Sequence, residues 1–216
     1  MSEAALKLMT WLSPGYPVGA YTYSHGLERA IEDGDITDAA TAEDWIEAVL
    51  CHGGARSDAI LLCHAWRSEK ARDRSKIEDL ADLAEALAPS AERRLETMAQ
   101  GAAFAEVTGA AWCSDPTPLP HPLAVGKAAA EHDIPLAEVL PAYLQAFAAN
   151  LVSAAIRLVP FGQTDGQRII AALMPKVLTL ATELVDAPLD DIGGCAIRSD
   201  IAAMRHETQT VRLFRS

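Results

Sequence analysis

Apolar residues recur at spacings of three and four along most of this 216-residue chain, which is the period of a helix with one buried face. The repeat is clear from Ile77 to Leu87, where Pro89 ends it, and again in the apolar stripe from Tyr143 to Ile156. No segment alternates polar positions with β-branched or aromatic ones, as a half-buried strand would. The pattern therefore predicts an all-α fold.

Turn and capping residues divide this pattern into about nine or ten helices. The predicted helices are Ala4 to Leu12, a short one that Ser24 caps, one through Trp45 to Leu50 that Thr41 caps and Gly53-Gly54 ends, one through Ile60 to Trp66, Ile77 to Leu87, one from the cap Ser90 through Val107, one from near Pro141 through Ile156, one from Thr164-Asp165 through Leu184 with a kink at Pro175, and Ser199 to His206. The segment from Cys113 to Pro122 is the clearest loop and the one candidate linker. Since the chain has no internal repeat, we expect residues 1–216 to form a single domain, an irregular helical bundle.

Composition narrows the class of protein further. The net charge of −12 gives the whole chain no basic footprint for phosphates, so nucleic acid is not an expected partner. The N-terminus lacks the pattern of a secretory signal, and the apolar segment from Ala142 to Val159 is too interrupted by polar residues to predict a membrane span. Four scattered cysteines without a CxxC pair are typical of reduced thiols. We expect a cytoplasmic protein.

Ser24 and His25 stand side by side in the glycine-rich stretch from Gly15 to Gly34, which raises the question of catalysis. Adjacent helical residues point about 100° apart, so the two side chains do not face each other. The elbow pattern G-x-S-x-G is also absent. We interpret Ser24 as an N-cap that accepts from the amide of Leu27 or a neighbour, with Glu28 favouring the positive helix end. A small hydrolase using Ser24 and His25 stays as an alternative.

The pairs Cys51-His52 and Cys63-His64 suggest a second alternative, a direct metal-binding protein. The pairs are twelve residues apart, about 18 Å along a helix, which is too far to share an ion unless Gly53-Gly54 folds them together. Ligand pairs in zinc motifs are also usually two to five residues apart rather than adjacent. Buried thiols in an alanine-rich helix are the favoured interpretation, and no metal site is predicted.

The last residues combine charge with apolar groups. Arg205, Arg212 and Arg215 outnumber the single acid Glu207, and the segment from Val211 to Phe214 adds apolar side chains. Terminal residues are disordered by default, but arginine and aromatic residues are enriched in interface anchors. Docking of this tail onto a partner, or onto the protein's own surface, is at least as well supported as disorder.

Three stretches together, "SPGYPVGAYTYSHGLE", "FGQTDGQR" and "HETQTVRLFRS", resemble the urease accessory protein F family. The similarity runs from about Trp11 to Ser216, with the motifs in the family's order. The resemblance implies an all-α, dimeric, non-enzymatic adaptor or chaperone in nickel insertion into urease. It implies assembly with accessory protein D (called H in some species) and the GTPase accessory protein G, and delivery of nickel to apo-urease. Nickel and GTP are then handled by the partner complex, and no cofactor is bound directly.

The resemblance also assigns residues. The glycine-rich stretch becomes a shaped recognition element, whereas His25 falls in a variable position of the family pattern. It further implies a mobile N-terminal segment, about residues 1–12, and a partner-binding tail, about residues 205–216. We expect this tail to be mobile in the free protein and to become ordered when accessory protein D binds. The implied partner-binding residues are Pro17, Gly19, Tyr21, Ser24, Gly26, Leu27 and Glu28 in the first motif and His206, Glu207, Arg212, Leu213, Phe214 and Ser216 in the tail.

Overall fold

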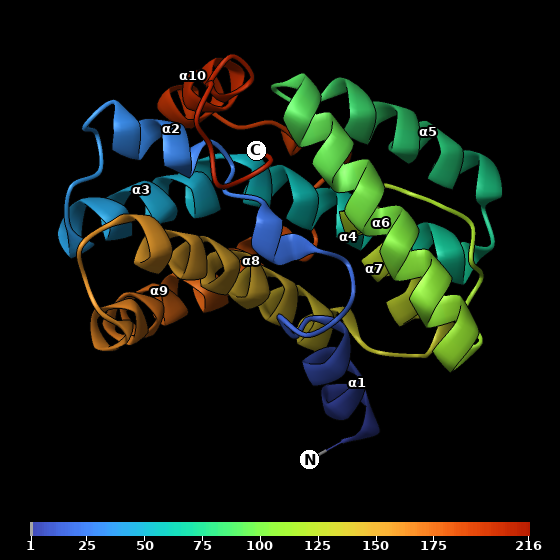
Figure 1. Cartoon of the computed structure of the whole chain (residues 1–216). Helices are drawn as coiled ribbons and strands as arrows, with labels where there is room; N and C mark the ends of the chain where they lie inside the picture. Colours follow the sequence, from blue (N-terminus) through green and yellow to red (C-terminus); the bar gives the residue numbers. More distant parts are fainter. Residues whose placement is uncertain (1) are drawn as a thin grey trace.

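The computed structural model describes residues 2–216, and in this part of the chain all regular secondary structure is helical, without a strand (Figure 1). The all-α prediction is confirmed. The helices are α1 (Glu3–Trp11), the 3₁₀-helix η1 (Ala20–Thr22), α2 (Leu27–Glu32), α3 (Ala39–His52), α4 (Gly54–Ala71), α5 (Arg74–Ala86), α6 (Ala91–Trp112), α7 (His121–Glu131), α8 (Leu136–Leu158), α9 (Gln163–Leu184), the 3₁₀-helix η2 (Leu189–Asp191) and α10 (Ile197–His206).

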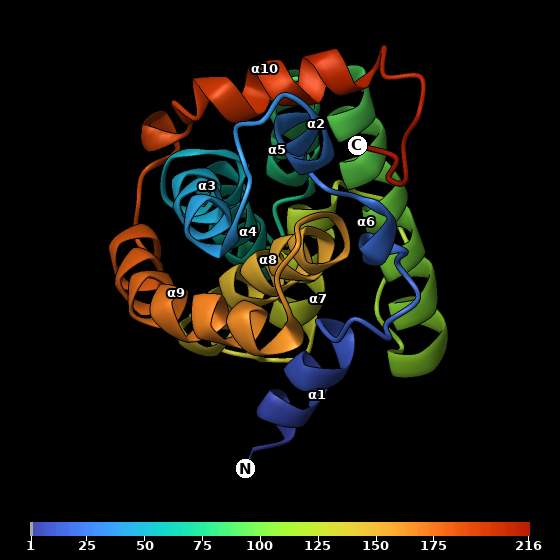
Figure 2. The same cartoon turned by 60° about the vertical axis from the view of Figure 1, so that its left-hand side comes forward.

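Two hydrophobic clusters form the core, and α8 contributes to both. Its first half gives Val139 and Leu144 to a cluster with α4, α5 and α7. Its second half gives Leu151 and Ala155 to a cluster with α2, α3 and α9. Phe147 packs against both clusters. One helix through both cores makes this a continuous bundle, in which α10 crosses over α2 while α6 runs along the side (Figure 2).

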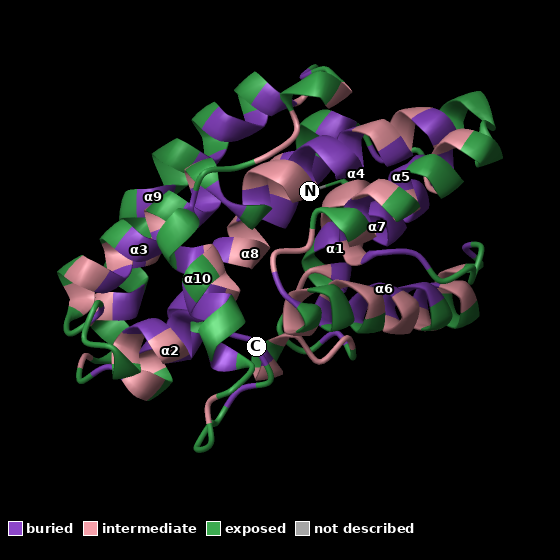
Figure 3. Cartoon of the chain, turned by 90° about the horizontal axis from the view of Figure 1, so that it is seen from above, coloured by how far each residue is buried: buried purple, intermediate pink, exposed green. Residues whose placement is uncertain are grey.

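The central helix α7 lies in a stretch where the sequence pattern indicated no helix. Nine of its eleven residues are buried, so it carries no polar face from which a helical period could be recognised (Figure 3). It packs closely on α4: a Cβ on Gly126 would lie 2.4 Å from the carbonyl oxygen of Leu62. Pro122 was predicted as the end of a loop, but it lies in the first turn of this helix, which begins at His121 and where proline costs no hydrogen bond.

Other helix boundaries differ from the predictions for local reasons. The N-cap of α3 is Asp38, whose Oδ1 accepts from the amide of Thr41 at 2.9 Å, while the Thr41 hydroxyl accepts from the amide of Asp38. Thr41 is thus the reciprocal member of a capping box rather than the cap itself. Helix α8 begins at Leu136, and Pro141 lies inside it rather than in its first turn.

The N-terminal helix α1 is anchored to the rest of the protein. Leu8 and Trp11 of α1 are buried in the core, although α1 projects from the body in Figure 1. The implied mobility of residues 1–12 stays a prediction, and Met1 lies outside the described residues.

By length and hydropathy α8 reaches the threshold for crossing a membrane, which the sequence pattern had not predicted, but half of its most apolar window is buried in the core. Such burial is typical of the core helix of a bundle.

Candidate partner-recognition surface

Two left-handed glycines shape the loop between α1 and α2. Gly19 (φ 73°) precedes η1, and Gly26 (φ 76°) caps α2. A Cβ on Gly26 would lie 2.6 Å from the backbone nitrogen of Ala203 in α10, so both the conformation and the close helix contact require glycine here. Because α2 touches α10 at this point, the loop is held against the helix that leads into the tail.

Ser24 differs from its predicted role. The N-cap of α2 is Gly26 rather than Ser24, but the Ser24 hydroxyl does accept from an amide next to that of Leu27, the amide of Glu28, at 3.3 Å. Its hydroxyl also donates to the backbone carbonyl of Ser216, which accepts from the Ser24 amide at 2.7 Å as well. Ser24 is fully buried. It therefore joins the loop to the last residue of the chain.

Glu28 is the main attachment point of the tail. Its carboxylate accepts from the amide of Leu213 at 2.6 Å and from the amide of Phe214 at 2.9 Å. The ring of His206 lies between two carboxylates, 3.3 Å from Glu28 and 2.6 Å from Glu92. Charge-assisted bonds to buried backbone amides are among the stronger hydrogen bonds in proteins, so this cluster fixes the path of the tail.

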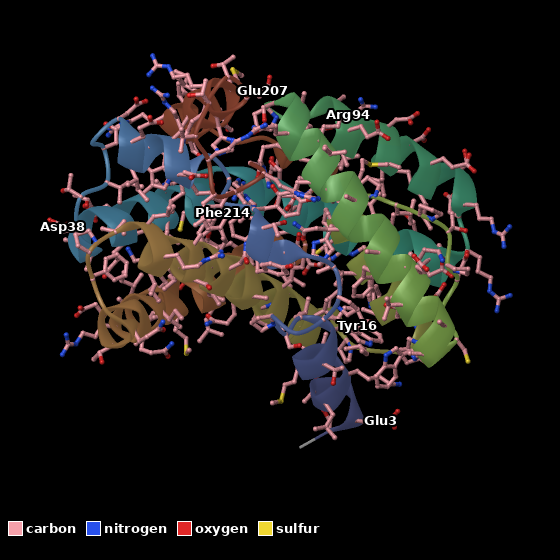
Figure 4. All side chains as sticks on the ribbon, in the orientation of Figure 1. Glu3, Tyr16, Asp38, Arg94, Glu207 and Phe214 are labelled. Atoms are coloured by element: carbon pink, nitrogen blue, oxygen red, sulfur yellow. The ribbon has the colours of Figure 1, made fainter. Side chains whose placement is uncertain are left out.

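Arginine side chains complete the attachment. Arg212 pairs with Glu92 of α6, so the residue predicted to anchor a partner is engaged within the chain. Arg157 of α8 places its guanidinium 4.3 Å from the ring centre of Phe214 and donates to the carbonyl oxygen of Tyr21 at 2.6 Å. Phe214 lies in the middle of the face seen in Figure 4, between the loop and α8, and is 3% exposed.

A buried polar group lies beneath the tail. Glu96 of α6 accepts from the Ser216 hydroxyl at 2.7 Å, lies 2.9 Å from His25 Nε2 and pairs with Arg93. Burial alone would raise the pKa of Glu96, but Arg93 and then His25 hold that pKa well below its usual range. Sequence reasoning missed Glu96. The only signal was the placement of polar residues on the face of α6 that also carries Phe104.

The predicted partner-binding residues separate into two groups by exposure. Seven of them are buried and hold the loop and tail together: Ser24, Gly26, Leu27, Glu28, His206, Phe214 and Ser216. Gly19 is half-buried. The exposed ones are Pro17, Tyr21, Glu207, Arg212 and Leu213. Buried side chains cannot touch a partner while the tail is docked, so the exposed group alone offers a contact surface. We call this set of five residues the loop–tail surface.

This docked tail changes the expectation for residues 205–216. They were expected to be free until a partner binds, yet Phe214 and Ser216 are buried in the chain's own body. Deleting them would take from Glu28 the two backbone amides that it accepts from and from Glu96 the Ser216 hydroxyl, and the loss of such hydrogen bonds to charged groups is costly. The own-surface docking that the composition allowed is what the structure contains. Mobility of the tail in solution stays a prediction.

The structure gives the two alternatives no support. The Ser24 hydroxyl bonds to backbone groups, and His25 Nε2 faces Glu96 rather than Ser24. Within residues 2–216 no group of three metal-ligating side chains comes together. Cys63 is buried, and burial raises its pKa to about 11, while His64 Nε2 lies 3.1 Å from the carbonyl oxygen of Ala187.

Fold and surface together define a class: an all-α protein whose terminal segment packs onto a glycine-shaped loop near its N-terminus, so that both form one surface. Comparison with known proteins places the chain more narrowly. The UreF family profile matches residues 36–174. The chain is 56% identical over 216 residues to the urease accessory protein UreF of Cereibacter sphaeroides strain KD131 / KCTC 12085. This match covers the full length of both chains. It is 50% identical over 219 residues to the urease accessory protein UreF of Rhodopseudomonas palustris strain HaA2. This match covers 97% of this chain and 92% of the relative.

The chain belongs to the UreF family, which confirms the resemblance seen in the three motifs. The loop and the tail lie outside residues 36–174, but the full-length relatives include both.

Proposed function

We propose that this chain is a urease accessory protein that acts as a non-enzymatic adaptor, or chaperone, in nickel insertion into apo-urease. Full-length similarity to relatives named urease accessory protein UreF supports the accessory role. The adaptor role rests on one observation: motif residues at opposite ends of the chain build a single surface rather than a pocket of reacting groups.

In this proposal the loop–tail surface binds accessory protein D (H in some species). Tyr21 is 61% exposed and Leu213 is 63% exposed, and both lie beside the arginine contacts that fix the tail. Tyrosine buries a large area at low entropic cost, and interface anchors are enriched in aromatic residues. The buried residues of the motifs then set the shape of the surface, whereas Tyr21 and Leu213 supply the contact.

The remaining assignments also belong to the proposal. The chain forms a homodimer in the cytoplasm, recruits the GTPase accessory protein G once D is bound, and leaves nickel and GTP to the partner complex. Exposed apolar residues at Ile197, Ile201 and Met204 on one face of α10 support a further protein contact, although they do not identify it.

Co-expression tests the proposal. The tagged chain is produced with accessory proteins D and G and urease in a strain that lacks its own accessory protein F. We expect D and G to co-purify with the chain and urease activity to depend on it. Purified chain that hydrolyses ester substrates, or a strain with full urease activity in its absence, would refute the adaptor role.

A further inference from the structure

A polar cluster that contains no residue of the loop–tail surface connects α1 to the end of α7. Lys7 of α1 places its ammonium nitrogen 3.2 Å from Nδ1 of His132, the C-cap of α7. The other ring nitrogen, Nε2, lies 3.0 Å from the hydroxyl oxygen of Ser114, in the loop after α6. The same ring packs against the ring of buried Trp11, with the two ring centres 5.2 Å apart. His132 thus contacts α1 through both Lys7 and Trp11.

The contact with Lys7 determines the protonation state of the His132 ring. An ammonium group only donates hydrogen bonds, so Nδ1 must accept and carries no proton. The proton of the neutral ring then lies on Nε2, which donates to the Ser114 hydroxyl. A doubly protonated ring has two donors and no acceptor, and it cannot form the bond to Lys7. The arrangement therefore requires a neutral histidine.

Lys7 is the charged group in direct contact with this ring. From α1, Glu3 pairs with Lys7 at 2.9 Å, and its side chain is mostly exposed. From the other side, Glu131 of α7 and Asp133 after it each pair with a lysine other than Lys7. The loop after α6 contributes the uncharged hydroxyl described above. Burial and then the Lys7 charge lower the pKa of His132, and together they outweigh the opposite effect of Glu131, Glu3 and Asp133.

We propose that His132 is a pH-sensitive latch, which holds α1 against the bundle while its ring is neutral and releases α1 when the ring binds a proton. The added proton removes the acceptor of the Lys7 hydrogen bond and places two positive charges 3.2 Å apart. Burial of Leu8 and Trp11 is then the main contact that still favours docking. The core cluster of α2, α3, α8 and α9 contains no residue of α1, so we expect local opening rather than unfolding.

The sign of the effect follows from the direction of the pKa change. The pKa of His132 is lower while α1 is docked than its ordinary value of 6.5, which applies once the ring is free in water. The undocked state therefore binds the proton more tightly, so docking is strongest above about pH 6.5 and weakens as the pH falls below it. One proton changes the opening constant of α1 by at most about tenfold per pH unit. The latch concerns the isolated chain and does not depend on the proposed partners.

Hydrogen exchange of the α1 amides in the full chain tests the latch between pH 7.5 and 5, with each rate corrected for the intrinsic pH dependence of exchange. We expect the opening constant of α1 to rise below pH 6.5, by up to about tenfold per pH unit, while the α3 amides stay protected. In His132→Asn it should stay constant, because the amide oxygen can accept from Lys7 but cannot bind the proton. The control, His52→Asn at an exposed position of α3, should keep the wild-type profile. Parallel profiles for the wild type and His132→Asn would overturn the proposal.

A second measurement does not require His132→Asn to fold. Nitrogen NMR of the His132 ring reports its tautomer and its titration midpoint. We expect the proton on Nε2 at pH 7.5 and a midpoint below 6.5 in the wild type. Lys7→Met keeps an unbranched side chain without the charge, so it should raise the midpoint. A neutral ring with its proton on Nδ1, or a midpoint that Lys7→Met leaves unchanged or lowers, would contradict the latch.

Discussion

Glu28 is a buried carboxylate whose closest partners are two backbone amides more than 180 residues further along the chain. A carboxylate can accept both bonds at once, and His206 contacts it as well. Sequence alone assigned Glu28 to the favourable end of a helix dipole, which is correct for α2 but misses the tail. The sequence pattern identified the motif but could not predict that Glu28 binds the tail, because its partners are backbone amides, which every residue except proline carries.

We predict that Glu28→Gln loosens the tail. Glutamine keeps the size but has one acceptor oxygen, so one of the two amides loses its partner. Hydrogen bonds to charged groups contribute about 1.5–3 kcal/mol, and we expect a loss of that order in the free energy of unfolding. Hydrogen exchange should speed up at Leu213 and Phe214. The control, Glu32→Gln on the exposed side of α2, should change stability by less than about 1 kcal/mol. Unchanged protection of both amides in Glu28→Gln would disprove this role.

Thiol reactivity offers a separate test at the residue scale. Cys63 is fully buried and burial raises its pKa to about 11, whereas Cys113 and Cys195 are exposed. The thiolate is the reactive form, so at pH 8 we expect an alkylating reagent to modify Cys113 and Cys195 quickly and Cys63 only after unfolding. Mass spectrometry of timed samples measures each site. Modification of Cys63 in the folded chain at the rate of Cys113 would contradict the burial of Cys63 in α4.

At the scale of elements, periodicity predicted the helices that have one polar face. The helix from Ala91 to Trp112 and its cap Ser90 match the prediction, and so does the final helix up to His206. Periodicity failed where burial is all-round or where proline misleads. Helix α7 has no polar face, and the start of α8 lies before Pro141 because tertiary packing outweighs the local breaker.

The contact of α4 with α7 can be tested at Gly126. We predict that Gly126→Ala lowers the free energy of unfolding by about 2 kcal/mol or more. The new Cβ would lie 2.4 Å from the carbonyl oxygen of Leu62, which can move only with its helix. Gly162→Ala is the matched control, since a Cβ there meets no atom within 4 Å. Thermal and urea unfolding of both variants measure the difference. If the two variants are equally stable, the helices cross less closely than described.

At the scale of the whole molecule, sequence reasoning reached the fold class and the family, but not the joining of the two motifs. The contact between Ser24 and Ser216 spans almost the entire chain, and no local spacing encodes it. Tyr21 could be selected from the sequence because an aromatic residue in a glycine-rich loop has little core of its own to fill. Which motif residues face outward depends on tertiary packing, and only the structure separates Tyr21 from buried Leu27.

The affinity of the purified chain for accessory protein D tests the proposed adaptor role most directly. Tyr21→Ala removes an exposed ring, so its melting temperature should equal that of the wild type, while loss of an interface anchor should cost about 2 kcal/mol, roughly 30-fold in Kd. Leu178→Ala is the control: it removes a side chain of similar exposure on α9, away from the loop–tail surface. We predict that titration calorimetry shows weakened binding for Tyr21→Ala and wild-type binding for Leu178→Ala. Wild-type affinity in Tyr21→Ala, with Leu178→Ala weakened instead, would contradict a partner site on the loop–tail surface.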